Sequence, residues 1–391
     1  MACRFYQEGM TKKLFWLLGV SALLQSLLFR AHAATTGTVL SWGDNSFGQT
    51  NVPAGLSGVT AVASGGDYTV ALKTDGTVVA WGSNSRGQTN VPTGLNGVAA
   101  IAGGYEHIVA LKSNGTVVAW GAGMTSTGVF PEFGQSIVPL GLTGVTAIAA
   151  GDGHTAAVKS DGTVVAWGRN GSGETTIPVG LSGVVAIACG DRCTVALKSD
   201  GTVVFLGNTE NGKANVPVGL SGVTAIAMVD SHTVALKGNG TVVAWGFNSS
   251  GSTVIPVGLS GVVAVAAGAS HSVALKSDGT VVAWGSNGSA QTTVPAGLSG
   301  VTAIAAGFFH TVAVMPAPLP AFSFGNLKFY AGMTLDGSVG QQFRMDYADV
   351  LGGVTNWLTL SNLTLPYSPF LVIDPASPGR TNRFYRAVPL P

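Results

Sequence analysis

Charged side chains are scarce in this sequence. Only 9% of its 391 residues are Asp, Glu, Lys or Arg, whereas about 25% is usual for a soluble domain. The formal net charge of +1 creates no broad basic field, which argues against nucleic-acid binding through many phosphate contacts. Intrinsic disorder is also excluded, because a disordered chain is charged and poor in aliphatic residues, and 46% of these residues are hydrophobic.

Catalytic motifs are missing too. The sequence contains no Gly-x-Ser-x-Gly elbow, no His-Glu-x-x-His pair and no phosphate-binding loop. Its acidic residues stand mostly one at a time, at turns that recur along the chain. We therefore expect no catalytic residues, no cofactor and no metal site, and we expect that the protein is not an enzyme.

Long hydrophobic runs are absent except near the N-terminus. Two lysines precede the apolar run Leu14–Phe29, and the small-residue motif Ala31-His32-Ala33 follows it. This order is typical of a secretory signal peptide, here residues 1–33. The alternative is an uncleaved anchor, although the run is short for a membrane span of about 20 residues. We expect a secreted, periplasmic or cell-surface monomer with no membrane span after cleavage.

Cysteine is rare, with three in the chain. Two of them, Cys189 and Cys193, flank three residues in one copy of a repeat. An exported protein can form a disulfide between such cysteines. The alternative is two unpaired buried thiols, because cysteines at strand ends do not always meet the required Cα separation of under about 7 Å. Both alternatives stay open.

Glycine is abundant, at 57 residues, and one stretch recurs from the first forty residues to Met315. In Val70–Gly82, two short aliphatic strands flank Asp75-Gly76, a pair that favours a tight hairpin turn. Trp-Gly pairs recur every 39 residues, with one interval of 47 and with Leu206 in place of one Trp. A period of about 40 with strand-like segments predicts the blades of a β-propeller, because helical repeats of this length need 3.6-residue periodicity.

Each copy contains four strand-like segments, one of which ends at a Val-Pro or Ile-Pro pair. The array begins with Thr38–Trp42, the second strand of a hairpin, and ends with His310–Met315, the first strand of one. We expect these two strands to pair, which closes the ring and removes exposed sheet edges. The predicted fold is all-β: a seven-bladed propeller of four-stranded blades over residues 34–315.

The copies resemble the regulator-of-chromosome-condensation repeat. The shared pattern is Trp-Gly-x-Asn-x-x-Gly-Gln-Thr-x-Val-Pro, then Gly-Val-x-Ala-Ile-Ala-x-Gly-x-x-His-Thr-Val-Ala-Leu-Lys, over about residues 36–315. Known members of this family are seven-bladed propellers. The 39-residue period is most similar to the secreted bacterial branch, which includes a propeller-type β-lactamase inhibitor protein, and is less similar to the nuclear exchange factor with its longer repeats.

The repeats stop at Met315 and a different composition follows. Three prolines within residues 316–320 predict a stiff linker. Residues 321–391 form short alternating stretches that contain Asn356-Trp357 and Arg383–Arg386. On these residues the segment resembles the small immunoglobulin- or fibronectin-like modules at the C-termini of some exported bacterial proteins, which implies a small β-sandwich.

Two repeated polar positions are predicted to be structural. One holds five histidines, which a ring of blades spaces too widely to share one metal ion, so we expect each to bond a neighbouring backbone group. They are His107, His154, His232, His271 and His310. The other holds lysines that precede the hairpin turns, such as Lys73, and these protect turn ends. An anion-binding rim is the alternative for the lysines.

Function is expected in the loops that vary between otherwise constant copies. The pair of residues before the repeated His position supplies six candidate binding residues: Tyr105, Glu106, Asp191, Arg192, Phe308 and Phe309. The third copy is eight residues longer and inserts Met124–Phe133. Met124, Phe130 and Phe133 are further candidates, because aromatic anchors in loops are frequent hot spots. The alternative is that these aromatic rings fold back onto the blade.

The sequence therefore predicts an exported, non-catalytic binding scaffold that presents its variable loops to a protein or a surface polysaccharide. Three other functions stay open. The resemblance to the β-lactamase inhibitor implies inhibition of an extracellular or periplasmic enzyme. The second is a carbohydrate-active propeller enzyme, which needs a non-repeating cluster of His, Arg, Tyr or Glu that we do not find. The third is a guanine-nucleotide exchange factor.

Overall fold

The computed structural model describes residues 37–316 and, further along the chain, the strands 332–335, 342–348, 358–364, 370–373 and 384–389. The predicted signal peptide, the linker residues 317–320 and Asn356-Trp357 lie outside the described residues. The chain divides into two compact units, residues 1–317 and 318–391. Within the described residues, no helix is long and apolar enough to cross a membrane.

Residues 37–316 form seven three-stranded sheets. Their strands are rich in Val, Ile and Thr, whose branched side chains suit a pleated surface. Six of the sheets use consecutive strands, which are β2 (Val59–Ser64), β3 (Tyr68–Lys73) and β4 (Val78–Gly82); β5 (Val98–Gly103), β6 (His107–Lys112) and β7 (Val117–Gly121); β10 (Val145–Ala150), β11 (His154–Lys159) and β12 (Val164–Gly168); β13 (Val184–Cys189), β14 (Cys193–Lys198) and β15 (Val203–Gly207); β16 (Val223–Val229), β17 (His232–Lys237) and β18 (Val242–Gly246); β19 (Val262–Ala267), β20 (His271–Lys276) and β21 (Val281–Gly285). Two short elements occur in the segments that connect these sheets. They are the hairpin of β8 (Ser126–Val129) and β9 (Glu132–Phe133), and the 3-10 helix η1 (Glu210–Gly212).

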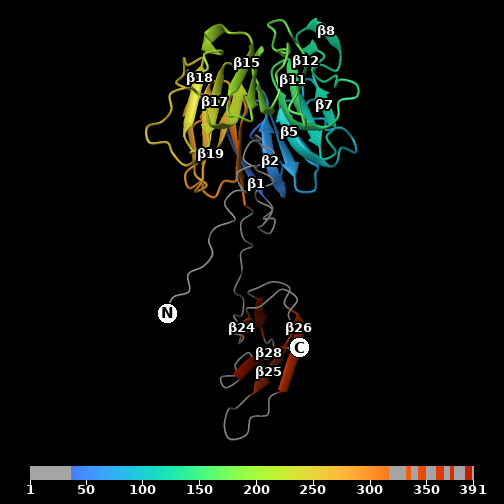
Figure 1. The fold of residues 1–391 in the computed structure, drawn as a ribbon, viewed down its shortest axis with the longest axis vertical. Coiled ribbons are helices and arrows are strands. Elements are labelled where there is room, and N and C mark those ends of the chain that lie inside the picture. The colour runs from blue at the N-terminus through green and yellow to red at the C-terminus, as the bar shows by residue number, and fades with distance from the viewer. Residues whose placement is uncertain are drawn as a thin grey trace. The chain divides into compact units, whose positions relative to one another are not determined.

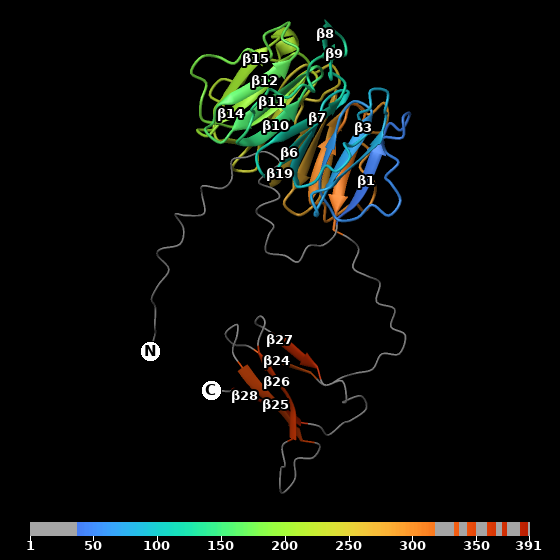
Figure 2. The same ribbon diagram turned by 90° about the vertical axis from the view of Figure 1, so that its right-hand side faces the viewer.

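The seventh sheet joins the two ends of the array. It has the order β1 (Thr38–Gly43), β23 (His310–Met315), β22 (Ala303–Ala306). Thr38 lies opposite Met315 and Gly43 opposite His310 in an antiparallel register, and Figure 2 shows blue β1 beside the orange strands. The predicted pairing of the terminal strands is confirmed.

The first strands of successive sheets contact one another in a closed cycle. The order is β2, β5, β10, β13, β16, β19 and β22, and β22 contacts β2 again. Figure 1 shows these sheets side by side in one body. Residues 37–316 therefore form a ring of sheets with no open end.

The predicted fourth strand of each copy is absent. Residues 83–97, between β4 and β5, consist of turns and irregular chain. In this segment the Asn84 side chain makes hydrogen bonds in place of a neighbouring strand. It accepts from Thr89 N (3.0 Å) and donates to Asn90 Oδ1 (2.9 Å). Pro92 has no N–H to donate to a ladder. Leu95 still packs against the core, so the segment covers the sheet without pairing with it.

The second and third strands of a sheet are joined by a three-residue turn. Gly76 has a positive φ of +75°, so the Asp75-Gly76 pair supplies the left-handed residue that the predicted tight hairpin turn needs. Asp75 accepts from Thr77 N (3.0 Å) and pairs with Lys73 (3.2 Å). The same ion pair recurs at Lys159–Asp161, Lys198–Asp200 and Lys276–Asp278. These pairs support the turn-protecting role of the lysines.

The core lies between neighbouring sheets. Val70, Ala71 and Val109 on the middle strands are fully buried, and their small size allows close sheet-on-sheet packing. Each buried Trp spans a junction, because its indole N–H donates to a backbone carbonyl of a neighbouring copy, which lies 32 residues earlier for every buried Trp except Trp42. Trp81 donates to Gln49 O at 3.0 Å in this way.

The C-terminal unit contains antiparallel strands only, within its described residues. β24 (Gly332–Leu335) pairs with β27 (Phe370–Ile373). β25 (Gln342–Ala348) lies between β26 (Leu358–Thr364) and β28 (Phe384–Pro389). The described chain is all-β apart from the 3-10 helix η1, as the sequence predicted.

Candidate functional site

The variable loops lie side by side in one belt. Each loop joins the first two strands of a sheet, and in every loop except that of Asp230 the N–H of the first variable residue donates to the loop of the next sheet. Gly66 donates to Tyr105 O (3.1 Å), Tyr105 to Gly151 O (3.2 Å) and Phe308 to Gly65 O (3.2 Å). The belt therefore brings loops from both ends of the array together.

Five predicted aromatic residues form one continuous surface, which we call the aromatic ladder. Its rungs are Phe133 to Phe130 (6.4 Å between ring centres), Phe130 to Tyr105 (6.0 Å), Tyr105 to Phe308 (4.9 Å) and Phe308 to Phe309 (6.2 Å). These separations lie in the range of favourable aromatic pairs. Phe130 is 53% exposed and Phe309 42%, so the ladder presents apolar surface to solvent.

One glycine allows the two halves of the ladder to meet. Gly66 lies between Tyr105 and Phe308 in the belt. A Cβ at Gly66 would lie 3.0 Å from Tyr105 O and 3.1 Å from its ring. Any larger residue at this variable position would therefore displace Tyr105.

The insertion in the third copy forms the β8–β9 hairpin, which carries two rungs of the ladder. Its base is held by the Glu132 carboxylate, which accepts from Gly123 N (3.1 Å), Thr125 N (3.3 Å) and Thr125 Oγ1 (3.0 Å). Phe130 stays exposed, whereas Phe133 is partly buried. Phe130 is therefore exposed, as a binding hot spot requires, whereas Phe133 folds back toward the blade, as the alternative predicted. Met124 is 60% exposed beside them.

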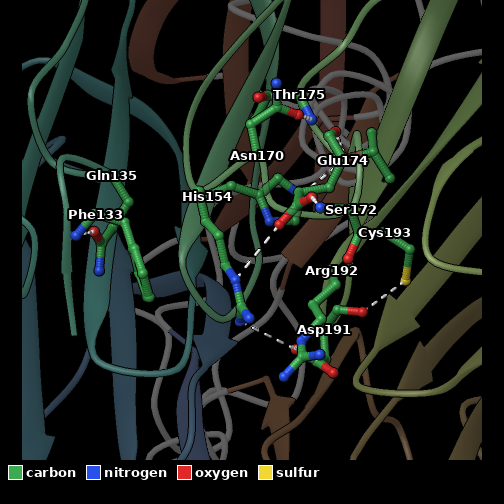
Figure 3. A network of polar contacts seen from close by, with 12 residues as sticks. Phe133, Gln135, His154, Asn170, Ser172, Glu174, Thr175, Asp191, Arg192 and Cys193 are labelled. Carbon is green, nitrogen blue, oxygen red and sulfur yellow. Dashed lines mark hydrogen bonds and ion pairs between the residues drawn. The ribbon is translucent and has the colours of Figure 1, made fainter. Parts of the chain in front are cut away.

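A charged cluster adjoins the aromatic ladder, and Figure 3 shows its Glu174, Asp191 and Arg192. The Arg169 guanidinium lies 5.2 Å from the Phe133 ring centre, within cation–π range. It also pairs with Glu174 (3.7 Å) and Asp191 (3.8 Å). Arg192 pairs with Asp191 at 3.5 Å, so both predicted residues of this loop belong to the cluster.

Three carboxyl groups on the belt have raised pKa values. Burial, together with Asp44, raises the pKa of Asp67. Burial raises the pKa of Glu106, against the effect of Arg86 at 3.6 Å. Burial, together with Asp191 and Asp230, raises the pKa of Asp152 to about 7. Asp152 thus changes charge near neutral pH.

Asp152 and Arg169 stand at variable loop positions of the sequence but were not among the predicted binding residues, and Lys213 was missed. Lys213 is 4% exposed and donates to Asp191 O at 3.0 Å. It stands where other copies have Gln, Glu or Ser, so the break in the repeat was a usable signal. Arg169 follows the Trp-Gly of its copy, and it meets Phe133 because the two consecutive sheets that carry these loops lie side by side.

The repeated histidines join neighbouring sheets. His154 Nε2 lies 2.8 Å from Thr194 Oγ1 of the next sheet. Thr194 Oγ1 itself donates to Glu174 O (2.9 Å), so the imidazole must donate through Nε2. The pairs His107–Thr155, His232–Ser272, His271–Thr311 and His310–Thr69 repeat this contact. The partner is a hydroxyl and not the predicted backbone group. The part of the chain that the structure describes holds no group of three His, Cys, Asp or Glu suited to a metal ion.

The two cysteines are free thiols, so the disulfide alternative is wrong for this structure. Cys189 lies opposite Thr194 in the sheet. Cys193 is the neighbour of Thr194, so its side chain points to the other face. There its Sγ lies 3.2 Å from Asp191 O (Figure 3) and 3.8 Å from Met228 Sδ. The two sulfurs belong to cores on opposite sides of one sheet.

Comparison with known proteins supports the repeat and the scaffold. No curated protein matches the chain. A family model for the regulator of chromosome condensation (RCC1) repeat matches residues 59–88, 98–123, 145–174, 223–252 and 262–291.

Several solved structures share the fold. Prp20p from Saccharomyces cerevisiae, described with its binding to Gsp1p and histones, is 19% identical over 73% of this chain and 93% of its own, with a TM-score of 0.61. Human WBSCR16 is 18% identical over 70% of this chain and 98% of its own, with a TM-score of 0.58. The ectodomain of the Arabidopsis thaliana receptor kinase ACR4 is 21% identical over 67% and 99%, with a TM-score of 0.51. At these identities the likeness concerns the fold alone. Five segments of the chain therefore match the RCC1 repeat, and residues 37–316 share the fold of the RCC1-like propeller scaffold.

Proposed function

We propose that this chain is an exported, non-catalytic binding scaffold whose loop belt docks a protein. The aromatic ladder carries the proposal, because rings from the second, third and last copies form one apolar surface. Exposed aromatic clusters of this kind mark interaction sites on otherwise polar surfaces, and aromatic side chains are prominent among interface hot spots. The adjacent charged cluster provides the polar rim that such interfaces use.

The remaining architecture fits the same proposal. The seven sheets act as seven blades of a closed propeller, which holds the loops in fixed positions. Residues 1–33 direct export, as in the secreted bacterial branch of the family. The C-terminal unit is a small fibronectin-like β-sandwich that follows the binding domain.

The test is capture of a partner by the mature protein from periplasmic extract or culture medium, followed by binding measurements with the purified partner. Phe130→Ser together with Phe133→Ser should weaken binding at least tenfold, because truncation of a hot spot costs about 2 kcal/mol or more. The matched control is Phe247→Ser, which removes an aromatic ring that is 40% exposed and outside the ladder. Equal binding by the ladder variant and the control contradicts the proposal.

The identity of the captured molecule separates the other functions. A hydrolytic enzyme whose activity falls on binding indicates an inhibitor, and a small GTPase that releases nucleotide indicates an exchange factor. Retention of a surface polysaccharide instead of a protein contradicts the protein-docking proposal.

A further inference from the structure

A small pocket lies at the centre of the belt, beside the aromatic ladder. Its lining includes Tyr105, Phe308 and Asp152, together with Gly104 and Gly151. We call it the belt pocket. Its volume is about 10 Å³, which is room for one group of the size of a water molecule. The three larger lining residues are each only partly buried, so an approaching partner can reach the pocket.

The negative charge in the belt pocket has no fixed counterion. Asp191, the next acidic residue of the belt, pairs with Arg169, Arg192 and Lys213. No ion pair within 4 Å joins Asp152 to any residue of the described chain. Only the Asp152 backbone N–H has a partner on the belt, Gly190 O at 3.4 Å. Its carboxylate is therefore free to bind a cation.

We propose that the belt pocket binds the ammonium group of a lysine side chain from the docked protein. This inference rests on the proposed function and adds the chemistry of the central contact. Aromatic faces attract a cation within about 6 Å of the ring centre, and a carboxylate in the same pocket neutralises its charge. An ammonium group is similar in size to water, whereas a planar guanidinium is larger than the pocket. The lysine stem lies against Tyr105 and Phe308, which continues the contact along the ladder.

The protonation of Asp152 supports the same chemistry. Burial, Asp191 and Asp230 raise its pKa to about 7, and Lys213 and Arg169 act in the opposite direction. The carboxyl group is therefore partly protonated at neutral pH in the free protein. A bound ammonium favours the carboxylate form, so binding should strengthen as the pH rises through about 7.

The test uses the full mature protein and three small probes, the Nα-acetyl methylamides of lysine, arginine and norleucine. NMR titration follows the backbone amides of Gly104 and Gly151. The lysine probe should shift both amides, and the norleucine probe, which lacks the ammonium, should bind at least tenfold more weakly. Asp152→Asn should weaken lysine binding at least tenfold and remove its dependence on pH.

The control variant is Asp278→Asn, which changes an acidic residue at a hairpin turn outside the belt, where it pairs with Lys276. It should bind the lysine probe within twofold of the parent. The inference is overturned if Asp152→Asn binds lysine as the parent does, or if the arginine or norleucine probe binds equally well. Loss of partner capture by the Phe130 and Phe133 variant, with unchanged capture by Asp152→Asn, overturns this inference alone and leaves the docking function intact.

Discussion

At the scale of single residues, the junctions between sheets depend on one hydroxyl. Thr155 Oγ1 accepts from His107 Nε2 (2.9 Å) and donates to Gln135 O (2.8 Å). Thr233 occupies the equivalent position, but Cys193 replaces the histidine that would reach it. Thr233 Oγ1 is buried and has no hydrogen-bond partner. Thr233 therefore serves as an internal control for the contribution of the His–Thr hydrogen bond to stability.

Thr155→Val and Thr233→Val should have opposite effects on stability. The first leaves a buried imidazole N–H and a carbonyl without their hydroxyl partner, and should lower the free energy of unfolding by about 2–4 kcal/mol. The second replaces an unsatisfied hydroxyl with a methyl group of similar shape and should leave stability equal or higher. Urea unfolding of both variants measures the difference. Equal destabilisation by the two variants would contradict the role of the hydroxyl.

Sequence reasoning predicted that the histidines are structural but assigned them the wrong partner. Their even spacing is visible in the repeat, which was enough to argue against a shared metal. The hydroxyl partner of His107 lies 48 residues away on the next sheet. Thr155 directly follows the repeated His of its own copy, but the repeat alone does not show that this hydroxyl faces the imidazole of the neighbouring copy. The same limit applies to Asp152, since its raised pKa comes from burial in the folded belt and from Asp191 and Asp230 of other loops.

At the scale of elements, the β8–β9 hairpin is the main departure from the repeat. The 47-residue interval predicted an insertion, but a sequence with no alternating pattern does not reveal a hairpin. Its conformation depends on Glu132, whose carboxylate collects three donors at the hairpin base. The predicted fourth strands do not form for a related reason. The Asn side chains of those segments make local hydrogen bonds that compete with the backbone hydrogen bonds of a sheet.

Glu132→Ala should release the hairpin without unfolding the ring. Loss of the carboxylate leaves the amides of Gly123 and Thr125 without an acceptor, at a cost of about 1–3 kcal/mol. We expect hydrogen exchange of amides 126–133 to speed up about tenfold or more, and partner binding to weaken because Phe130 loses its fixed position. Glu132→Gln, which keeps one acceptor oxygen, should be intermediate. Unchanged exchange in the Ala variant would show that the hairpin is held by other contacts.

At the scale of the whole molecule, the ring closure was predictable and the binding surface was only partly so. An incomplete hairpin at each end of the array predicted the pairing of β1 with β23. The variable loops predicted Tyr105, Phe308 and Phe309 separately. These rings join Phe130 in one ladder because the pairing of β1 with β23 closes the ring and places the last loop beside the first. Gly66, a variable position without a side chain, leaves the space in which they meet.

The buried histidines should make the ring sensitive to acid. Burial lowers the pKa of His107 and His271 to about 3 and that of His154, His232 and His310 to about 4. Below pH 6.5 the unfolded chain therefore binds five protons that the folded ring does not. Asp152 has the opposite effect. Its pKa is about 7 in the folded ring and 3.8 in its ordinary state, so between these values the folded ring binds one proton that the unfolded chain does not.

These shifts predict a stability that is full above pH 6.5 and falls as the pH approaches 4. Near pH 5 the net difference of four protons corresponds to about 5 kcal/mol of unfolding free energy per pH unit. Urea unfolding at pH 7.5, 6.0 and 5.0 measures this slope. His107→Gln removes one of the five titrating groups and should reduce the slope by about 1.4 kcal/mol per pH unit, while lowering stability at pH 7.5. A stability that does not change between pH 6.5 and 4.5 would show that the histidines are protonated in the folded ring, and that their contacts to the neighbouring hydroxyl groups do not depend on the neutral imidazole.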